Sequence, residues 1–160
     1  MRFQWWLLSL ALVTGCSPRL RFATEDEAAA TGVTLRVRHI NGRTGGEMSL
    51  HYIGTAACFI TNPNRCAVYL DFYDAQHQPL MPNRKVKQAC NPLDTGLVKL
   101  APGDSMRYAL ESPRNKYDDQ ELLRARYFEV IYEGSIVPHR DAKRAQRFTR
   151  YTFKATGRIE

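Results

Sequence analysis

The chain has 160 residues, of which 44% are hydrophobic and 24% are charged, and its formal net charge is +7. This length fits a single domain, and the apolar content excludes a disordered chain. The positive charge favours acidic partners such as anionic lipid or acidic protein, although an excess of charge also serves solubility alone.

Residues 1–16 have the layout of a secretory signal. Arg2 supplies one positive charge, residues 3–13 are apolar except for Gln4 and Ser9, and small residues precede Cys16. An apolar stretch this short does not cross a bilayer as a helix, which needs about 20 residues. We therefore expect residues 1–15 to be a signal peptide that is removed.

The junction Val13-Thr14-Gly15-Cys16 resembles the lipobox of bacterial lipoproteins. That resemblance implies cleavage before Cys16, lipidation of its thiol and acylation of the new amino terminus. Ser17 stands where lipoproteins retained in the inner membrane commonly carry Asp, so the resemblance also favours the periplasmic face of an outer membrane. The alternative is an ordinary cleaved signal followed by an incidental cysteine. Outside the cytoplasm, nucleic acid is not expected as a partner.

Residues 16–32 show no sustained apolar periodicity and are predicted to form the lipidated anchor and tether of a domain spanning residues 33–160. Within that domain, apolar and polar residues alternate with the period of two that is typical of β-strands. The alternation covers residues 33–38, 48–52, 67–73, 97–100, 106–111, 128–132 and 149–155. One helix is predicted over residues 118–126, where acids come first and arginines last.

These short strands and the turn signals between them predict an all-β fold, an antiparallel immunoglobulin-like β-sandwich of about seven strands with one short helix. Two segments are similar to a pattern of extracytoplasmic immunoglobulin-like domains: residues 70–76, a strand that ends in an Asp-containing turn, and residues 100–104, a turn with Pro102-Gly103. Pro followed by Gly suits a type II turn, because the glycine accepts a positive φ.

Three cysteines remain after Cys16, and an oxidising envelope permits one disulfide between them. The turn-rich stretch between Cys58 and Cys66 favours a Cys58–Cys66 bridge, because closing a short loop costs the least entropy. Cys90 is equally compatible as the partner of either residue.

Two surface features are candidates for binding. Tyr69 and Tyr73 share one strand face, and Tyr127 and Ile131 share another, which predicts aromatic patches with polar rims of the kind found at protein interfaces. Neighbouring loops that cover these faces are the alternative. The second feature is a basic patch for an anionic partner, formed by Arg140, Lys143, Arg144, Arg147 and Arg150.

Catalytic and metal-binding patterns are weak. Gly103-Asp104-Ser105-Met106 is similar to the nucleophile block of GDSL-type esterases, but the serine lies mid-chain, and His139 precedes Asp141, the reverse of the order in that family. We interpret this stretch as a turn and expect no catalytic residues. The four histidines are dispersed, so no metal, cofactor or small-molecule substrate is predicted.

The sequence thus favours a lipid-anchored periplasmic protein without catalytic activity that binds another envelope protein. Its size, lipobox and cysteines resemble the immunity lipoproteins that neutralise toxins of type VI secretion. An accessory lipoprotein of a secretion or pilus machine is an alternative. A structural envelope protein that contacts anionic lipid or peptidoglycan through the basic patch is another.

Overall fold

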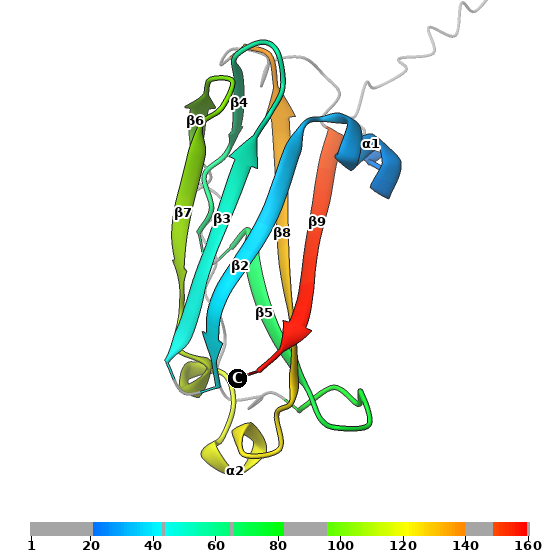
Figure 1. Ribbon diagram of the computed structural model, residues 1–160. Coiled ribbons are helices and arrows are strands. Elements are labelled where there is room, and N and C mark those ends of the chain that lie inside the picture. The colour runs from blue at the N-terminus through cyan, green and yellow to red at the C-terminus, as the bar shows by residue number, and fades with distance from the viewer. Residues whose placement is uncertain (1–20, 43, 65, 82–95, 140–148, 160) are drawn as a thin grey trace, which may run out of the picture.

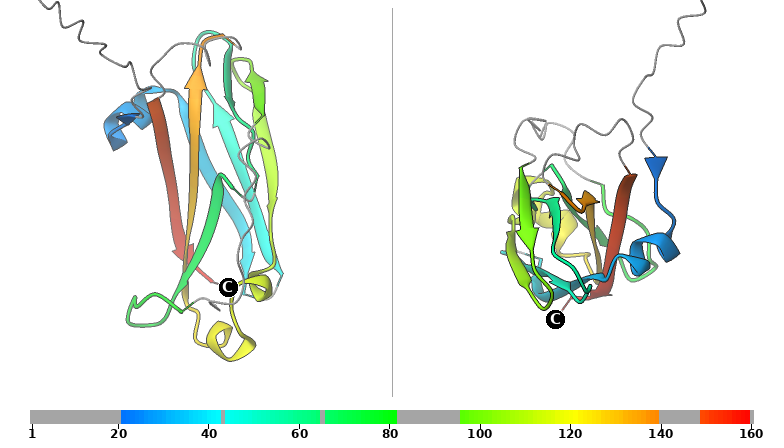
Figure 2. Two further views of the ribbon diagram at one scale, coloured as in Figure 1. Left: turned by 180° about the vertical axis from the view of Figure 1, so that it is seen from behind. Right: turned by 90° about the horizontal axis from the view of Figure 1, so that it is seen from above.

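The computed structural model describes residues 21–42, 44–64, 66–81, 96–139 and 149–159, which form two β-sheets facing each other (Figure 1, Figure 2). The larger sheet has the order β1 (Arg21–Phe22), β9 (Thr149–Arg158), β8 (Tyr127–Val137), β4 (Cys58–Thr61), β6 (Leu97–Leu100), and β5 (Val68–Tyr73) also pairs with β8. The smaller sheet has the order β2 (Val33–Asn41), β3 (Gly45–Tyr52), β7 (Ser105–Leu110). The all-β prediction is confirmed.

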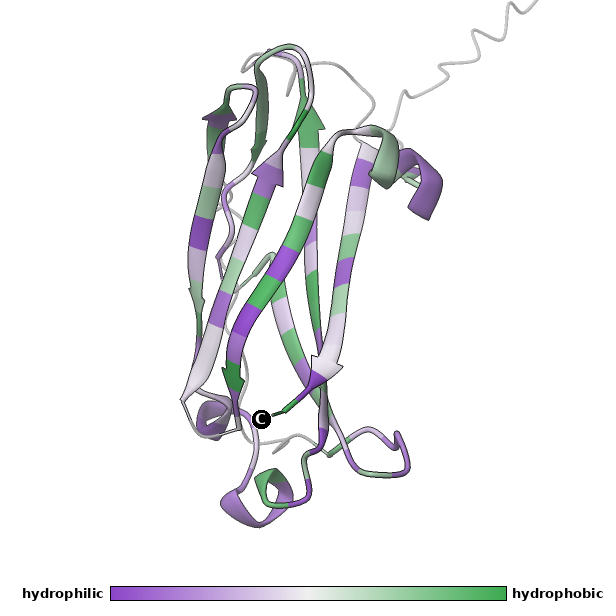
Figure 3. Cartoon of the chain, viewed as in Figure 1, coloured by the Kyte–Doolittle hydropathy of each residue, from purple (hydrophilic) through white to green (hydrophobic). Residues whose placement is uncertain are grey.

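Strands β2 and β3, predicted from the alternation over residues 33–38 and 48–52, form an antiparallel hairpin. Leu35 pairs with Leu50 and Val37 with Met48, so the apolar members of both strands lie on the same face. Met48 and Leu50 are almost fully buried beneath the larger sheet. The alternation is visible along β2 as bands of contrasting hydropathy (Figure 3).

Strand β8 is the centre of the larger sheet. One edge pairs with β9 over most of its length. The other edge pairs first with β5, up to Tyr132, and then with β4 at Ile136 and Val137. Strands β4 and β5 therefore share one edge of β8, and part of the turn-rich stretch between Cys58 and Cys66, including Asn62-Pro63-Asn64, separates them.

The turn at residues 101–104 carries the chain from β6 in the larger sheet to β7 in the smaller sheet. Gly103 has a φ of 87°, and the Asp104 N–H donates to the Ala101 carbonyl over 3.0 Å. The Asp104 side chain accepts a hydrogen bond from the Ala101 N–H in return. Every residue of the GDSL-like stretch up to Ser105 thus has a place in a turn or at a strand start.

One hydrophobic core joins both sheets. Its largest fully buried side chains are Tyr132, Phe72, Met48, Leu50, Ile60 and Val130. The Tyr132 hydroxyl donates to the Thr61 carbonyl over 2.5 Å, so the polar tip of this buried ring has a partner.

Residues 21–32, expected as part of the tether, are folded onto the larger sheet. Strand β1 pairs in parallel with the first residues of β9, and helix α1 (Glu25–Ala30) follows it. A capping box starts the helix: the Thr24 hydroxyl accepts from the Glu27 N–H, and the Glu27 carboxylate accepts from the Thr24 N–H. This local signal and the pairing with β9 explain why the domain begins before Val33.

The helix predicted over residues 118–126 is shorter. Helix α2 (Asp119–Leu122) follows a 3-10 helix, η2 (Pro113–Asn115), and the chain then enters β8. The Arg126 N–H donates to the Tyr73 carbonyl over 2.8 Å, and Ala125 is buried, so sheet pairing ends the helix early.

We name the two ends of the domain for later use. At the proximal end lie β1, α1, and the starts of β2 and β9 (Figure 1). At the distal end lie α2, the end of β9, and the turn that follows β5 (Figure 1).

Candidate binding site

The pairing of β5 with β8 brings the predicted aromatic residues together on one sheet face. Tyr69 lies opposite Ile131, and Tyr73 lies opposite Tyr127. All four residues are half-buried, so they are neither fully exposed nor fully covered by neighbouring loops. The alternation in the sequence predicted two separate strand faces for the two pairs. The register of β5 and β8 places all four residues on one face of the larger sheet.

A turn after β5 adds an imidazole ring that the sequence did not indicate. The Asp74 carboxylate accepts hydrogen bonds from the N–H groups of Gln76 and Gln78, each over 2.9 Å, and folds the chain back sharply. Within this turn His77 has a φ of 57°, a left-handed conformation that is uncommon for histidine. Its ring stacks on Tyr127 with the centroids 4.0 Å apart.

A carboxylate and a guanidinium border these rings. The Tyr73 hydroxyl donates to Glu129 Oε2 over 3.0 Å. Burial and then this carboxylate raise the pKa of Tyr73, so the phenol stays protonated and holds Glu129 in place. Along the opposite edge of β8, which pairs with β9, Arg158 lies directly opposite Tyr127.

Together these groups form a pocket of about 430 Å³, which we call the aromatic pocket. Its lining comprises Tyr73, His77, Tyr127, Phe128, Glu129, Thr156, Gly157 and Arg158. Gly157 pairs with Phe128, and a Cβ at Gly157 would lie 2.6 Å from the Phe128 ring. The missing side chain therefore leaves room for that ring.

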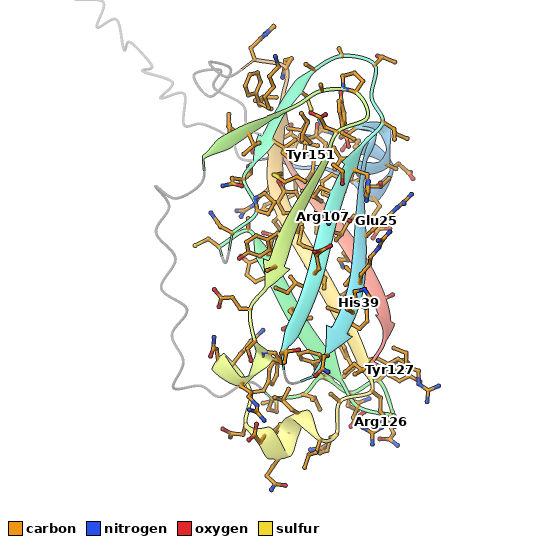
Figure 4. The ribbon with its side chains drawn as sticks, turned by 60° about the vertical axis from the view of Figure 1, so that its left-hand side comes forward. Glu25, His39, Arg107, Arg126, Tyr127 and Tyr151 are labelled. Atoms are coloured by element: carbon orange, nitrogen blue, oxygen red, sulfur yellow. The ribbon has the colours of Figure 1, made fainter. Side chains whose placement is uncertain are left out.

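A second hollow of about 590 Å³ lies on the other side of the end of β9. It shares Phe128, Thr156, Gly157 and Arg158 with the aromatic pocket and is completed by residues 37–40 of β2. The end of β9 is thus flanked by open space on both sides. Figure 4 shows Tyr127 and Arg126 near this end of the domain.

The aromatic pocket has the chemistry of a binding site for a side chain. Aromatic rings pair favourably with another ring or with an aliphatic group, at about 0.5–1.5 kcal/mol for a ring pair. Glu129 and Arg158 at the border can bond the polar tip of such a group.

Most of the predicted basic patch lies outside the described residues: Arg140, Lys143, Arg144 and Arg147. Arg150 is described, and its guanidinium lies 3.3 Å from the Glu133 carboxylate. Arg150 is therefore already paired with an acidic side chain.

The predicted Cys58–Cys66 disulfide is not formed, and both residues are free thiols. Next to Cys58, Phe59 pairs with Val137 of β8, and next to Cys66, the Ala67 carbonyl accepts from the Glu133 N–H, so about 13 Å of β8 separates the two positions. A disulfide needs Cα atoms within about 7 Å. Cys58 is buried, and this burial raises the pKa of its thiol. Cys16 and Cys90 lie outside the described residues.

Among the described residues, no group of three or more His, Cys, Asp or Glu side chains is arranged to hold a metal ion. In the same part of the chain, no helix has the length and apolar character needed to cross a bilayer.

Comparison with protein-family models and with curated proteins finds no match for this chain.

Proposed function

We propose that this chain is a non-catalytic binding protein of the cell envelope, anchored by lipid at Cys16 on the periplasmic face of an outer membrane, and that it binds another envelope protein. The aromatic pocket is the observation that carries the proposal. It presents two tyrosine rings, one histidine ring, one carboxylate and one guanidinium on an accessible sheet face. Aromatic residues and arginine are the residue types enriched at protein interfaces.

The proposed fold is an immunoglobulin-like sandwich, and the strand order supports it. A hairpin and β7 form one sheet, β8 and β9 lie together in the other, and the chain passes repeatedly between the sheets. Many domains with this architecture bind proteins through sheet faces or through the loops at one end.

A neutraliser of a secreted toxin is the specific role we propose for such a protein. A partner that inserts one aromatic or long aliphatic side chain into the aromatic pocket would fit its volume and lining.

The test is affinity capture of the lipidated protein's partner from solubilised envelopes, followed by measurement of Kd with the purified partner. Tyr127→Ala removes the ring that both Tyr73 and His77 flank, and we expect it to weaken binding about 30-fold, as at a hot spot. Glu129→Gln is expected to weaken binding less, because only the charge is lost.

Glu47→Gln is the matched control, because Glu47 lies on β3 in the smaller sheet. A partner that binds Tyr127→Ala and Glu129→Gln as tightly as the unaltered protein would exclude the aromatic pocket as the binding site.

A further inference from the structure

Two of the large apolar side chains most exposed in the described part of the chain lie at the proximal end. Phe22 is 62% exposed and Ile53 is 72% exposed. Phe22 pairs with Arg150 at the start of β9. Ile53 follows β3, and its N–H donates over 2.8 Å to the carbonyl of Gly32, just after α1. Isolated exposed apolar residues are ordinary, so their meaning depends on what this end faces.

The length of chain between Cys16 and β1 limits what the proximal end can face. Only four residues lie between Cys16 and Arg21, where β1 begins, and the five Cα–Cα steps from one to the other span at most about 18 Å. An anchor at Cys16 would therefore hold the proximal end close to the bilayer. The tether of residues 16–32 expected from the sequence would have allowed the domain much more freedom.

We propose that the proximal end rests on the bilayer surface, with Phe22 and Ile53 in contact with lipid, and that the aromatic pocket points away from the membrane. This inference rests on the lipid anchor of the proposed function. From Arg150, beside β1, to Gly157, in the aromatic pocket, β9 advances by about 24 Å. In Figure 4, Glu25 and Tyr151 lie toward one end of the domain, and Tyr127 and Arg126 lie toward the other.

The charges of the proximal end indicate the kind of lipid. The first turn of α1 holds Glu25, Asp26 and Glu27, and Arg21 is paired with Glu27. Exposed carboxylates repel an anionic surface, so the contact fits a zwitterionic bilayer, in which the apolar side chains and not the charges supply the attraction.

The sequence offers a clean reporter for the test. Its two tryptophans, Trp5 and Trp6, both precede Cys16 and leave with the signal peptide, so one introduced tryptophan is the only one in the mature protein. Ile53→Trp places it at the proximal end. Leu123→Trp is the matched control, because Leu123 is 60% exposed and directly follows α2 at the distal end.

The lipidated variants are bound to phosphatidylcholine vesicles with brominated acyl chains, and flotation and mass spectrometry establish the anchor independently. We expect the emission of Ile53→Trp to shift to the blue and to be lost by quenching, while Leu123→Trp emits as it does without bromine. If the protein floats but Ile53→Trp is quenched no more than Leu123→Trp, the orientation is wrong and the anchor stands. If mature protein carries no acyl mass on Cys16 and does not float, the anchor and the orientation are both overturned.

Discussion

Asp74 determines the shape of the aromatic pocket although it does not line it. Its side chain is only 10% exposed and accepts two backbone hydrogen bonds, and Arg124 pairs with its second oxygen over 3.3 Å. The hydrogen bond from Gln78 lowers the pKa of Asp74 most, followed by that from Gln76 and by Arg124, while burial opposes them. The turn that places His77 on Tyr127 therefore depends on one ionised carboxylate.

We expect Asp74→Asn to lower the Tm near neutral pH and to weaken the stacking of His77. Because the native pKa lies below the ordinary value of 3.8, the stabilisation is complete above that value and is lost as the pH falls through the native pKa. The difference in Tm between the unaltered protein and the variant should therefore shrink in acid. Thermal unfolding measured across this pH range checks it, with Asp26→Asn in α1 as the control. A difference that stays constant in acid would contradict the role of the charge.

At the scale of the elements, local sequence patterns predicted individual strands and turns. The alternation through residues 33–38 and 48–52 predicted β2 and β3, and Pro102-Gly103 predicted the turn before β7. The sequence favoured a tether over a short strand at β1, because a two-residue strand has no sustained periodicity and its pairing depends on β9, more than a hundred residues later.

The candidate site was predicted only in part, for the same reason. Tyr73 and Tyr127 were identified as surface aromatics, but their pairing requires the register of β5 and β8. His77, Gly157 and Arg158 reach the aromatic pocket through a turn and through a third strand. An alternating pattern gives the face of each residue within its own strand and says nothing about neighbours across the sheet.

Helix α1 has a separate test, because a short helix depends on its cap. Thr24→Ala removes the acceptor for the Glu27 N–H, and we expect it to cost the helix about 1 kcal/mol. The effect should be local: amide hydrogen exchange should become faster in α1 and β1, while the amides of β8 stay protected. Thr34→Ala, on the exposed face of β2, is the control. Equal acceleration in β8 would show that α1 unfolds only with the whole domain.

For the molecule as a whole, the shared core predicts one cooperative transition. Leu50 in the smaller sheet and Ile60 in the larger sheet are both fully buried in the same cluster. Leu50→Ala and Ile60→Ala should each lower the free energy of unfolding by about 2–5 kcal/mol. Near- and far-ultraviolet circular dichroism in urea should report coincident transitions for both variants. Two separated transitions would show that the sheets unfold independently.

The net charge has an uneven distribution. Acidic side chains slightly outnumber basic ones in the described residues, so the excess behind the formal charge of +7 belongs to the remaining segments of the sequence. Partners that respond to charge and partners that respond to shape would therefore contact different parts of this protein.

The two-residue strand β1 also gives the domain a mechanical property. A force applied through the N-terminal residues first loads the pairing of Arg21 and Phe22 with β9, and then α1, before it reaches β2. Released and fully extended, these twelve residues would reach at most about 40 Å, while the hairpin and the core stay intact. The start of the domain would act as an extensible joint that yields under tension before the fold does.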